Sequence, residues 1–245
     1  MELFHCFGAT PDHRVDTATA VAMLRAGGCR YLAINTHNVR DLTRGDDLPV
    51  GYATATFGSV RAALDGTGEY RPVLNINHPT TAEEAVDRAR RAVALTGIRV
   101  IKLEVLDAGL TGSRNDLVLD AARRLRGDGL EVWPLITPDL ETYQACLAAG
   151  CAMVRLMGSG IGSGLGIEPR RLSLIAEILA GSLVPVMLDG GIGSAAHVIQ
   201  AAELGFDSVL VNSCLFGPGT DPVRELAGLR AVVDHVAVGG RVSPA

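Results

Sequence analysis

The fold of this 245-residue chain is constrained most by a regular alternation of short apolar runs with longer amphipathic stretches. Eight runs are rich in Val, Ile and Leu, as are parallel strands that helices cover. They comprise residues 2–8, 30–35, 72–77, 99–105, 131–136, 152–157, 184–189 and 207–212. Helix-like stretches separate them, at 14–26, 81–95, 116–127, 139–149, 168–180, 194–204 and 221–236.

Strand–helix alternation predicts an α/β fold with a parallel sheet. Eight such units in a chain of this length favour a (β/α)8 TIM barrel over an open doubly wound sheet. We expect a single domain over residues 1–245, with a loose tail at 237–245. The segment 40–70 is undecided and has room for an extra short strand or helix.

Composition excludes several classes of protein. The net charge is −5 and there is no basic block, which argues against binding to nucleic acid or to an anionic membrane. We find no signal-peptide pattern, and no apolar run reaches the roughly 20 residues of a membrane helix. Five cysteines without a CxxC motif predict reduced, mostly buried thiols in a cytoplasmic protein.

A charged pair interrupts the fourth apolar run, VIKLEVL. Because side chains alternate along a strand, Lys102 and Glu104 share one face. The apolar residues Ile101, Leu103 and Val105 share the other face, which suits contact with helices, so the charged pair points into the barrel. A buried lysine is costly unless it is paired or discharged. Lys102 is therefore a structural ion-pair partner or, as we favour, an amine that forms an imine beside Glu104 as acid/base.

A carboxylate followed by glycines ends the seventh run, in MLDGGIG. Asp189 closes the strand, and Gly190, Gly191 and Gly193 precede a helix that starts near Ser194. Glycines let backbone N–H groups approach an anion, and a helix N-terminus adds its dipole. Since the loops after strands seven and eight commonly bind phosphate in such barrels, we expect a phosphate here.

Other candidate groups follow neighbouring runs. Asn212 and Ser213, after the eighth run, supply further donors. The five glycines at 157–166 fit a flexible lid, an anion-binding loop or an ordinary loop. His37 and His78 follow strands two and three and are candidates to face the site. The histidines lack metal-binding spacing and no nucleotide-binding motif fits, so we expect neither a metal nor a cofactor.

Four segments, in this order and spacing, resemble the thiazole synthases of thiamine biosynthesis: VIKLEVL, GCAMVRLMGSGIGSGLGI, VPVMLDGGIG and ELGFDSVLVNS. The match runs from about Thr81 to Leu229, and residues 1–80 match only loosely. The resemblance implies a (β/α)8 barrel that forms homo-oligomers and a lysine imine with 1-deoxy-xylulose 5-phosphate. It also implies that sulfur arrives as the C-terminal thiocarboxylate of a small ubiquitin-like sulfur carrier protein.

By position, the resemblance implies that Lys102 is the imine lysine and that Glu104 and Asp189 are the acid/base carboxylates. The phosphate- and substrate-binding positions of the family fall on Gly158, Gly190, Gly191, Asn212 and Ser213. These assignments agree with the roles argued above from the residues themselves.

The chain departs from the family around the rest of the substrate. LNINHP at 74–79 stands in place of PNTAGC and keeps Asn75, THNV at 36–39 loses both arginines of VRRV, and Arg155 replaces a methionine. We expect His78, Asn77 and Arg155 to add hydrogen-bonding groups suited to more hydroxyls.

This pattern favours a paralogue that uses the same chemistry on another sugar phosphate. One branch of the family resembles the 2-thiosugar synthases of antibiotic pathways, in which a hexose 6-phosphate forms the imine, shifts its carbonyl to C2 and accepts sulfur there. True thiazole synthesis is the first alternative. A lysine-imine aldolase or isomerase without sulfur, and a non-catalytic binding module, are the others.

Overall fold

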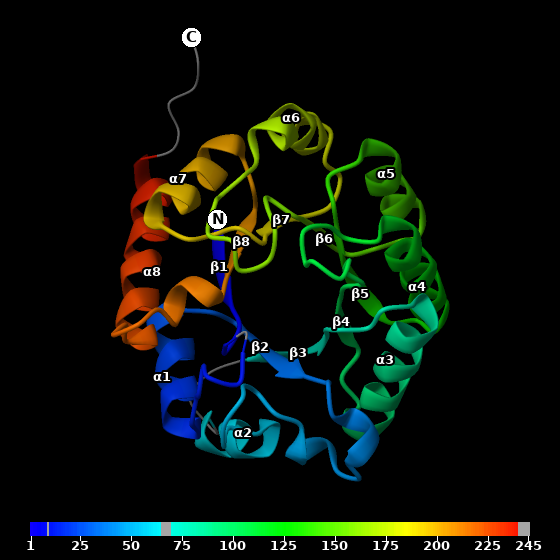
Figure 1. Ribbon diagram of the computed structural model, residues 1–245, viewed down its shortest axis with the longest axis vertical. Helices are drawn as coiled ribbons and strands as arrows, with labels where there is room; N and C mark the ends of the chain where they lie inside the picture. Colours follow the sequence, from blue (N-terminus) through cyan, green and yellow to red (C-terminus); the bar gives the residue numbers. More distant parts are fainter. Residues whose placement is uncertain (9, 65–69, 240–245) are drawn as a thin grey trace.

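A computed structural model of the protein describes residues 1–8, 10–64 and 70–239. Within them, eight strands alternate with eight α-helices, and the helices form a ring around the strands (Figure 1). The strands are β1 (Glu2–His5), β2 (Tyr31–Asn35), β3 (Arg71–Ile76), β4 (Val100–Leu103), β5 (Glu131–Ile136), β6 (Val154–Leu156), β7 (Val186–Asp189) and β8 (Ser208–Val211). The helices are α1 (Thr17–Gly27), α2 (Phe57–Leu64), α3 (Ala82–Thr96), α4 (Asn115–Gly127), α5 (Leu140–Ala148), α6 (Leu172–Ala180), α7 (Ala195–Leu204) and α8 (Pro222–Gly239).

All strand pairs are parallel, in the order β1-β8-β7-β6-β5-β4-β3-β2. The predicted (β/α)8 barrel is therefore confirmed. Between β1 and β2, the segment 49–51 fills the C-terminal end of the seam. The Asn35 N–H donates to the Pro49 carbonyl at 2.8 Å, and Gly51 forms a parallel bridge with Phe7.

The undecided segment 40–70 supplies the eighth helix. Short 3-10 turns at Val39–Asp41 and Gly45–Asp47 lead through an antiparallel bridge between Pro49 and Thr56 into α2. Residues 65–69 lie outside the described residues, and so do 240–245, which make up most of the expected tail. The last helix, α8, was expected to end at 236 but continues to Gly239. Among the described helices, none is long and apolar enough to cross a membrane.

Local sequence accounts for several helix boundaries. Asp16, Thr81 and Asp139 precede α1, α3 and α5, and each side chain accepts a hydrogen bond from the N–H three residues on. Gly97 and Gly205 end α3 and α7 in the left-handed conformation, where glycine avoids the Cβ clash.

Two apolar cores hold the barrel together. The larger core lies between strands and helices and includes Ile101, Leu103 and Val105, as predicted from the alternation in VIKLEVL. The smaller core fills the lumen and consists of Phe4, Cys6, Val73, Val100, Trp133, Met153, Met187 and Leu210. Lys102 follows Val100 on the lumen face. β4 ends at Leu103, two residues earlier than predicted, so Glu104 lies at the C-terminal mouth of the barrel.

Candidate active site

Four charged side chains meet inside the C-terminal half of the lumen. The Lys102 ammonium lies 3.3 Å from Glu104 Oε2 and 3.7 Å from Asp189 Oδ2. It also donates to Asn75 Oδ1 at 3.2 Å. Arg155 contacts both carboxylates from β6, at 3.2 Å from Glu104 and 2.5 Å from Asp189. The ends of β4, β6 and β7 thus bring two cations and two anions into one network. Glu104 belongs to it as the first residue after β4.

Lys102 is the single lysine of the sequence, and the other 21 of its 22 basic residues are arginines. Its side chain is 8% exposed. Every other basic residue of the chain is an arginine, and the one lysine lies at a buried position. Arginine stays protonated and cannot act as an amine nucleophile, whereas a buried lysine can. This count is a signal that sequence reasoning could have used and missed.

Arg155 is fully buried, and protein groups engage all five of its N–H donors. Nε and Nη2 donate to Asp189 and Glu104, and Nη1 donates to the carbonyls of Leu103 and Trp133 at 3.1 and 3.2 Å. No donor remains for a substrate hydroxyl, which is the role that we expected for this side chain. Its contacts hold the two carboxylates in place.

The two carboxylates differ in environment. Burial by itself would raise the pKa of Asp189, but the Arg155 guanidinium and the Lys102 ammonium outweigh burial and hold that pKa below its usual range. Asp189 is therefore a persistent anion. Both contacts to Glu104 fall on Oε2, so Oε1 has no hydrogen-bond partner among the described residues and remains free at the mouth. Glu104 is thus the better placed of the two to exchange protons with a bound molecule.

Asn75 connects Lys102 to the neighbouring strands. Its Nδ2 donates to Asn35 Oδ1 at 3.3 Å, and its backbone carbonyl accepts from the Thr36 hydroxyl at 2.8 Å. Both asparagines are buried on the lumen side. The sequence-predicted Asn75 is thus in the network through Lys102, and Asn35 is a neighbour that sequence analysis did not single out.

The predicted phosphate-site glycines pack the loops after β6 and β7 against each other. A Cβ on Gly191 would lie 2.4 Å from the Gly166 carbonyl, and one on Gly193 would lie 2.5 Å from the Gly164 carbonyl. Gly158 would meet the Gly190 carbonyl at 3.0 Å. Gly166 N–H donates to the Gly191 carbonyl at 2.7 Å. Only glycine permits this close approach, which shapes the C-terminal mouth next to Asp189.

Asn212 and Ser213 lie after β8, next to these loops. The Asn212 amide is occupied, because it accepts from the Gly8 N–H at 3.0 Å and donates to the Gly8 carbonyl at 3.2 Å. It therefore joins the ends of β1 and β8. Ser213 begins a 3-10 turn and faces the Gly162 loop. His197 is half-buried and accepts from the Gly193 N–H at 3.1 Å.

Across the mouth, three polar rings follow β2 and β3. His37 stacks on Tyr52 with ring centroids 5.8 Å apart. His78 is exposed and close enough to lower the pKa of His37, which burial lowers most. His37 and His78 were candidates from the sequence. Tyr52 was missed because it lies in the segment whose structure sequence patterns left undecided.

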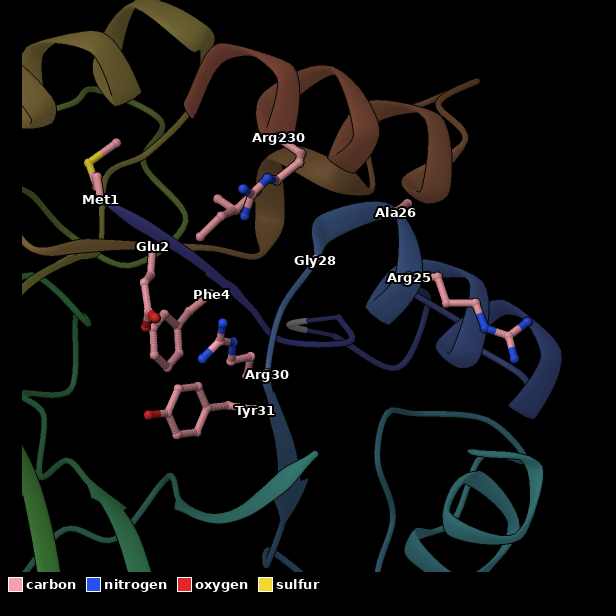
Figure 2. A pocket seen from close by; sticks show the side chains of 10 residues that line it. Met1, Glu2, Phe4, Arg25, Ala26, Gly28, Arg30, Tyr31 and Arg230 are labelled. Atoms are coloured by element: carbon pink, nitrogen blue, oxygen red, sulfur yellow. The ribbon is translucent and has the colours of Figure 1, made fainter. Parts of the chain in front are cut away.

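The opposite, N-terminal mouth has a hollow of about 490 Å³. Phe4 and Tyr31 stack there, with Arg30 and Glu2 beside them (Figure 2). Parallel strands begin at this end, so the hollow is separated from Lys102 by the apolar lumen core. The four-charge network does not line it.

A metal site and a reactive cysteine would be other sources of chemistry among the described residues. These residues contain no cluster of three or more His, Cys, Asp or Glu side chains that could hold a metal ion. Among them, all five cysteines are free thiols. Burial raises the pKa of the Cys6 thiol, the one that lies in the lumen. Cys6 is thus a neutral packing residue at neutral pH.

Comparisons with known proteins identify the family of the chain. The family model of the thiazole biosynthesis protein ThiG matches residues 65–241. The thiazole synthase of Exiguobacterium sibiricum is 34% identical over 226 residues, covering 91% of this chain and 82% of that protein. The thiazole synthase of Gluconobacter oxydans is 39% identical over 171 residues, covering 69% of this chain and 66% of that one.

Among solved structures, the BexX/CysO complex of Amycolatopsis orientalis contains a chain that is 28% identical to this one. The alignment covers 100% of this chain and 93% of that chain, with a TM-score of 0.78. Sequence and fold thus agree along almost the whole barrel. The chain belongs to the thiazole synthase family.

Proposed function

We propose that this chain is a sulfur-incorporating synthase in which Lys102 forms an imine with a sugar phosphate. One observation carries the proposal: the single lysine of the sequence lies in the lumen, 3.3 Å from one carboxylate and 3.7 Å from another. Imine formation requires an amine nucleophile and a nearby group that moves protons. The C-terminal ends of barrel strands are where such enzymes carry their chemistry.

The geometry suggests different roles for the two carboxylates. Lys102 Nζ bonds to the substrate carbonyl carbon, and that carbonyl oxygen leaves as water. Glu104, with one oxygen free, accepts the proton that Lys102 must lose and then moves protons between the carbons next to the imine. Asp189 stays ionised beside Arg155 and stabilises the positive charge of the protonated imine. Arg155 positions both carboxylates.

The phosphate is proposed to bind at the loops after β6, β7 and β8. The backbone around Gly158, Gly190, Gly191 and Gly193 lines this side, with Ser213 next to it. Since the Asn212 side chain is tied to Gly8, we assign it to shaping the site. Backbone N–H groups near the start of α7 suit an anion.

The sulfur donor is proposed to be the C-terminal thiocarboxylate of a small ubiquitin-like carrier protein. The related BexX chain was solved in complex with a second protein, CysO, which supports a protein partner for this barrel as well. The carrier tail would enter at the C-terminal mouth, where Glu104 lies. Assembly into homo-oligomers and a cytoplasmic location remain predictions.

Two branches of the family differ in substrate. We favour 2-thiosugar synthesis on a hexose 6-phosphate, because the sequence departs from the family at 36–39, 74–79 and 155–157. The alternative is true thiazole synthesis from 1-deoxy-xylulose 5-phosphate, which the names of the curated relatives favour. A sulfur-independent aldolase or isomerase would turn over substrate without any carrier protein.

Borohydride trapping tests the proposal. The protein is incubated separately with glucose 6-phosphate and 1-deoxy-xylulose 5-phosphate, reduced, and analysed by intact mass and peptide mapping. Because the chain has one lysine, a side-chain adduct has a single expected position. An adduct with the hexose phosphate alone supports the favoured branch, and one with the pentulose phosphate alone supports thiazole synthesis. No adduct with either sugar, beside a positive control, would falsify the imine mechanism.

A further inference from the structure

The segment that fills the seam between β1 and β2 places a tyrosine at the C-terminal mouth. Gly51 packs so closely on Phe7, two residues after β1, that a Cβ on Gly51 would lie 2.8 Å from the Phe7 carbonyl. Pro49 accepts a hydrogen bond from Asn35 at the end of β2. The chain is thus held on both sides just before Tyr52. This anchoring makes Tyr52 part of the mouth, although it follows neither strand directly.

Tyr52, His37 and His78 form what we call the aromatic wall. The Tyr52 and His37 rings are stacked, with an angle of 10° between their planes. His78 has a φ of 67°, an uncommon conformation for a residue other than glycine. Among the described residues, no hydrogen bond engages the Tyr52 hydroxyl or the rings of the two histidines. The wall therefore has polar atoms that are available to a ligand.

Burial favours the neutral forms of His37 and Tyr52 in this wall. Burial lowers the pKa of His37, and the neighbouring His78 and Arg88 lower it further. Burial raises the pKa of Tyr52, and Cys6 and Glu104 add to this. Tyr52 is thus near enough to Glu104 for that carboxylate to raise its pKa further. Neutral donors and acceptors suit hydroxyl groups, whereas a phosphate calls for cations or backbone N–H groups.

The strand order puts the wall across the mouth from the glycine loops. In the barrel, β2 and β3 lie opposite β6 and β7, with β4 and its Lys102 between them. A molecule bound by its phosphate at the glycine loops and by its carbonyl at Lys102 would extend its remaining groups toward the wall.

We propose that the aromatic wall binds hydroxyl groups of the phosphorylated substrate and thereby selects polyhydroxylated sugar phosphates over deoxy ones. This inference rests on the proposed sugar-phosphate function of Lys102. It assigns specificity to Tyr52, a residue outside the motifs of the family. It also accounts for the departures from the family at 36–39 and 74–79, whereas Lys102, Glu104 and Asp189 stand at the family's own positions.

The test compares Tyr52→Phe with Tyr31→Phe, which removes the same hydroxyl from a stacked tyrosine at the N-terminal mouth. Dissociation constants for glucose 6-phosphate, 1-deoxy-xylulose 5-phosphate and inorganic phosphate are measured by calorimetry. Loss of one hydrogen bond predicts about two- to tenfold weaker hexose phosphate binding in Tyr52→Phe. Binding of inorganic phosphate is unchanged, binding of the pentulose phosphate falls less, and Tyr31→Phe matches the wild type.

Three results overturn the inference. They are unchanged hexose phosphate binding in Tyr52→Phe, equal weakening for all three ligands, and a wild type that binds the hexose phosphate no more tightly than inorganic phosphate. Failure of the proposed function is distinguished by trapping. If Tyr52→Phe selectively weakens the hexose phosphate but the wild type gives no Lys102 adduct with it, the wall stands and the imine mechanism is wrong.

Discussion

The two mouths of the barrel differ in what their charges do. At the C-terminal mouth, Lys102, Glu104, Arg155 and Asp189 are buried and contact one another. At the N-terminal mouth, charges such as those of Arg71 and Glu131 pair at a partly exposed rim. A hollow of about 490 Å³ lies at the N-terminal mouth, yet the network suited to chemistry lies at the other.

The difference teaches that a hollow does not by itself mark the place of chemistry in this fold. A solvent-exposed ion pair is worth roughly 0–1 kcal/mol, because water screens it. A buried charge that lacks its partner lowers the stability of the folded protein by several kcal/mol, so positive and negative charges in the lumen must be equal in number. With two cations and two anions, the C-terminal network is balanced. It can therefore hold an amine beside carboxylates in a site that excludes most water.

Substitution of the lysine has the largest expected effect. Lys102→Ala removes the only side-chain amine, so we expect no trapped adduct and a loss of activity of at least about a thousandfold. Intact mass and turnover with a thiocarboxylated carrier measure the two effects. Lys102→Arg keeps the charge and is expected to fail equally. Activity that survives in Lys102→Arg would favour a structural ion pair.

The free carboxylate at the C-terminal mouth comes next. Glu104→Gln keeps the shape but cannot accept a proton, so we expect kcat to fall about 10²- to 10⁴-fold. Glu131→Gln makes the same change at the N-terminal rim and should leave kcat within twofold. Steady-state kinetics decides, and equal losses in both variants would remove the contrast between the two mouths.

The two mouths should also differ in stability. Arg155→Met strips both carboxylates of their shared guanidinium, and we expect the free energy of unfolding to fall by about 3–5 kcal/mol. Arg71→Met removes a rim pair and should cost less than about 1 kcal/mol. Urea unfolding monitored by circular dichroism measures both. Similar losses would show that the lumen network is no more tightly coupled than the rim.

Acid should weaken the C-terminal network through Asp189. Its pKa in the folded protein lies below the unfolded value of about 3.9, so unfolding takes up a proton in that range. This stabilisation is present above about pH 4 and is lost as the pH falls through the folded pKa. The wild type should lose its advantage over Asp189→Asn as the pH falls below about 4, as measured by unfolding at each pH. A constant difference would contradict this assignment.

The smallest effect is expected at the N-terminal hollow. Arg30 is exposed there and makes no ion pair among the described residues. Arg30→Ala should change the free energy of unfolding by less than about 0.5 kcal/mol and leave kcat/KM unchanged. A marked fall in kcat/KM would mean that the hollow takes part in function.

Much of the barrel could be predicted from local patterns. The alternation in VIKLEVL placed Ile101 and Leu103 toward the helices and Lys102 in the lumen, because the period of two is a property of any strand. Gly97 and Gly205 marked helix ends through their backbone freedom. Segment 40–70 resisted prediction because α2 is short and the chain leading into it is held by Phe7, just after β1, and by Asn35 of β2, both outside the segment.

The amino-acid sequence by itself determined the fold class, the lumen position of Lys102 and Glu104, and the glycine-rich loops beside Asp189. These follow from periodicity and from residue types that act within a few positions. Only the tertiary structure decided that all the N–H groups of Arg155 are hydrogen-bonded to protein atoms and that Tyr52 lies at the C-terminal mouth. The physical reason is that hydrogen-bond partners and ring contacts depend on strands brought together by barrel closure, which no local pattern encodes.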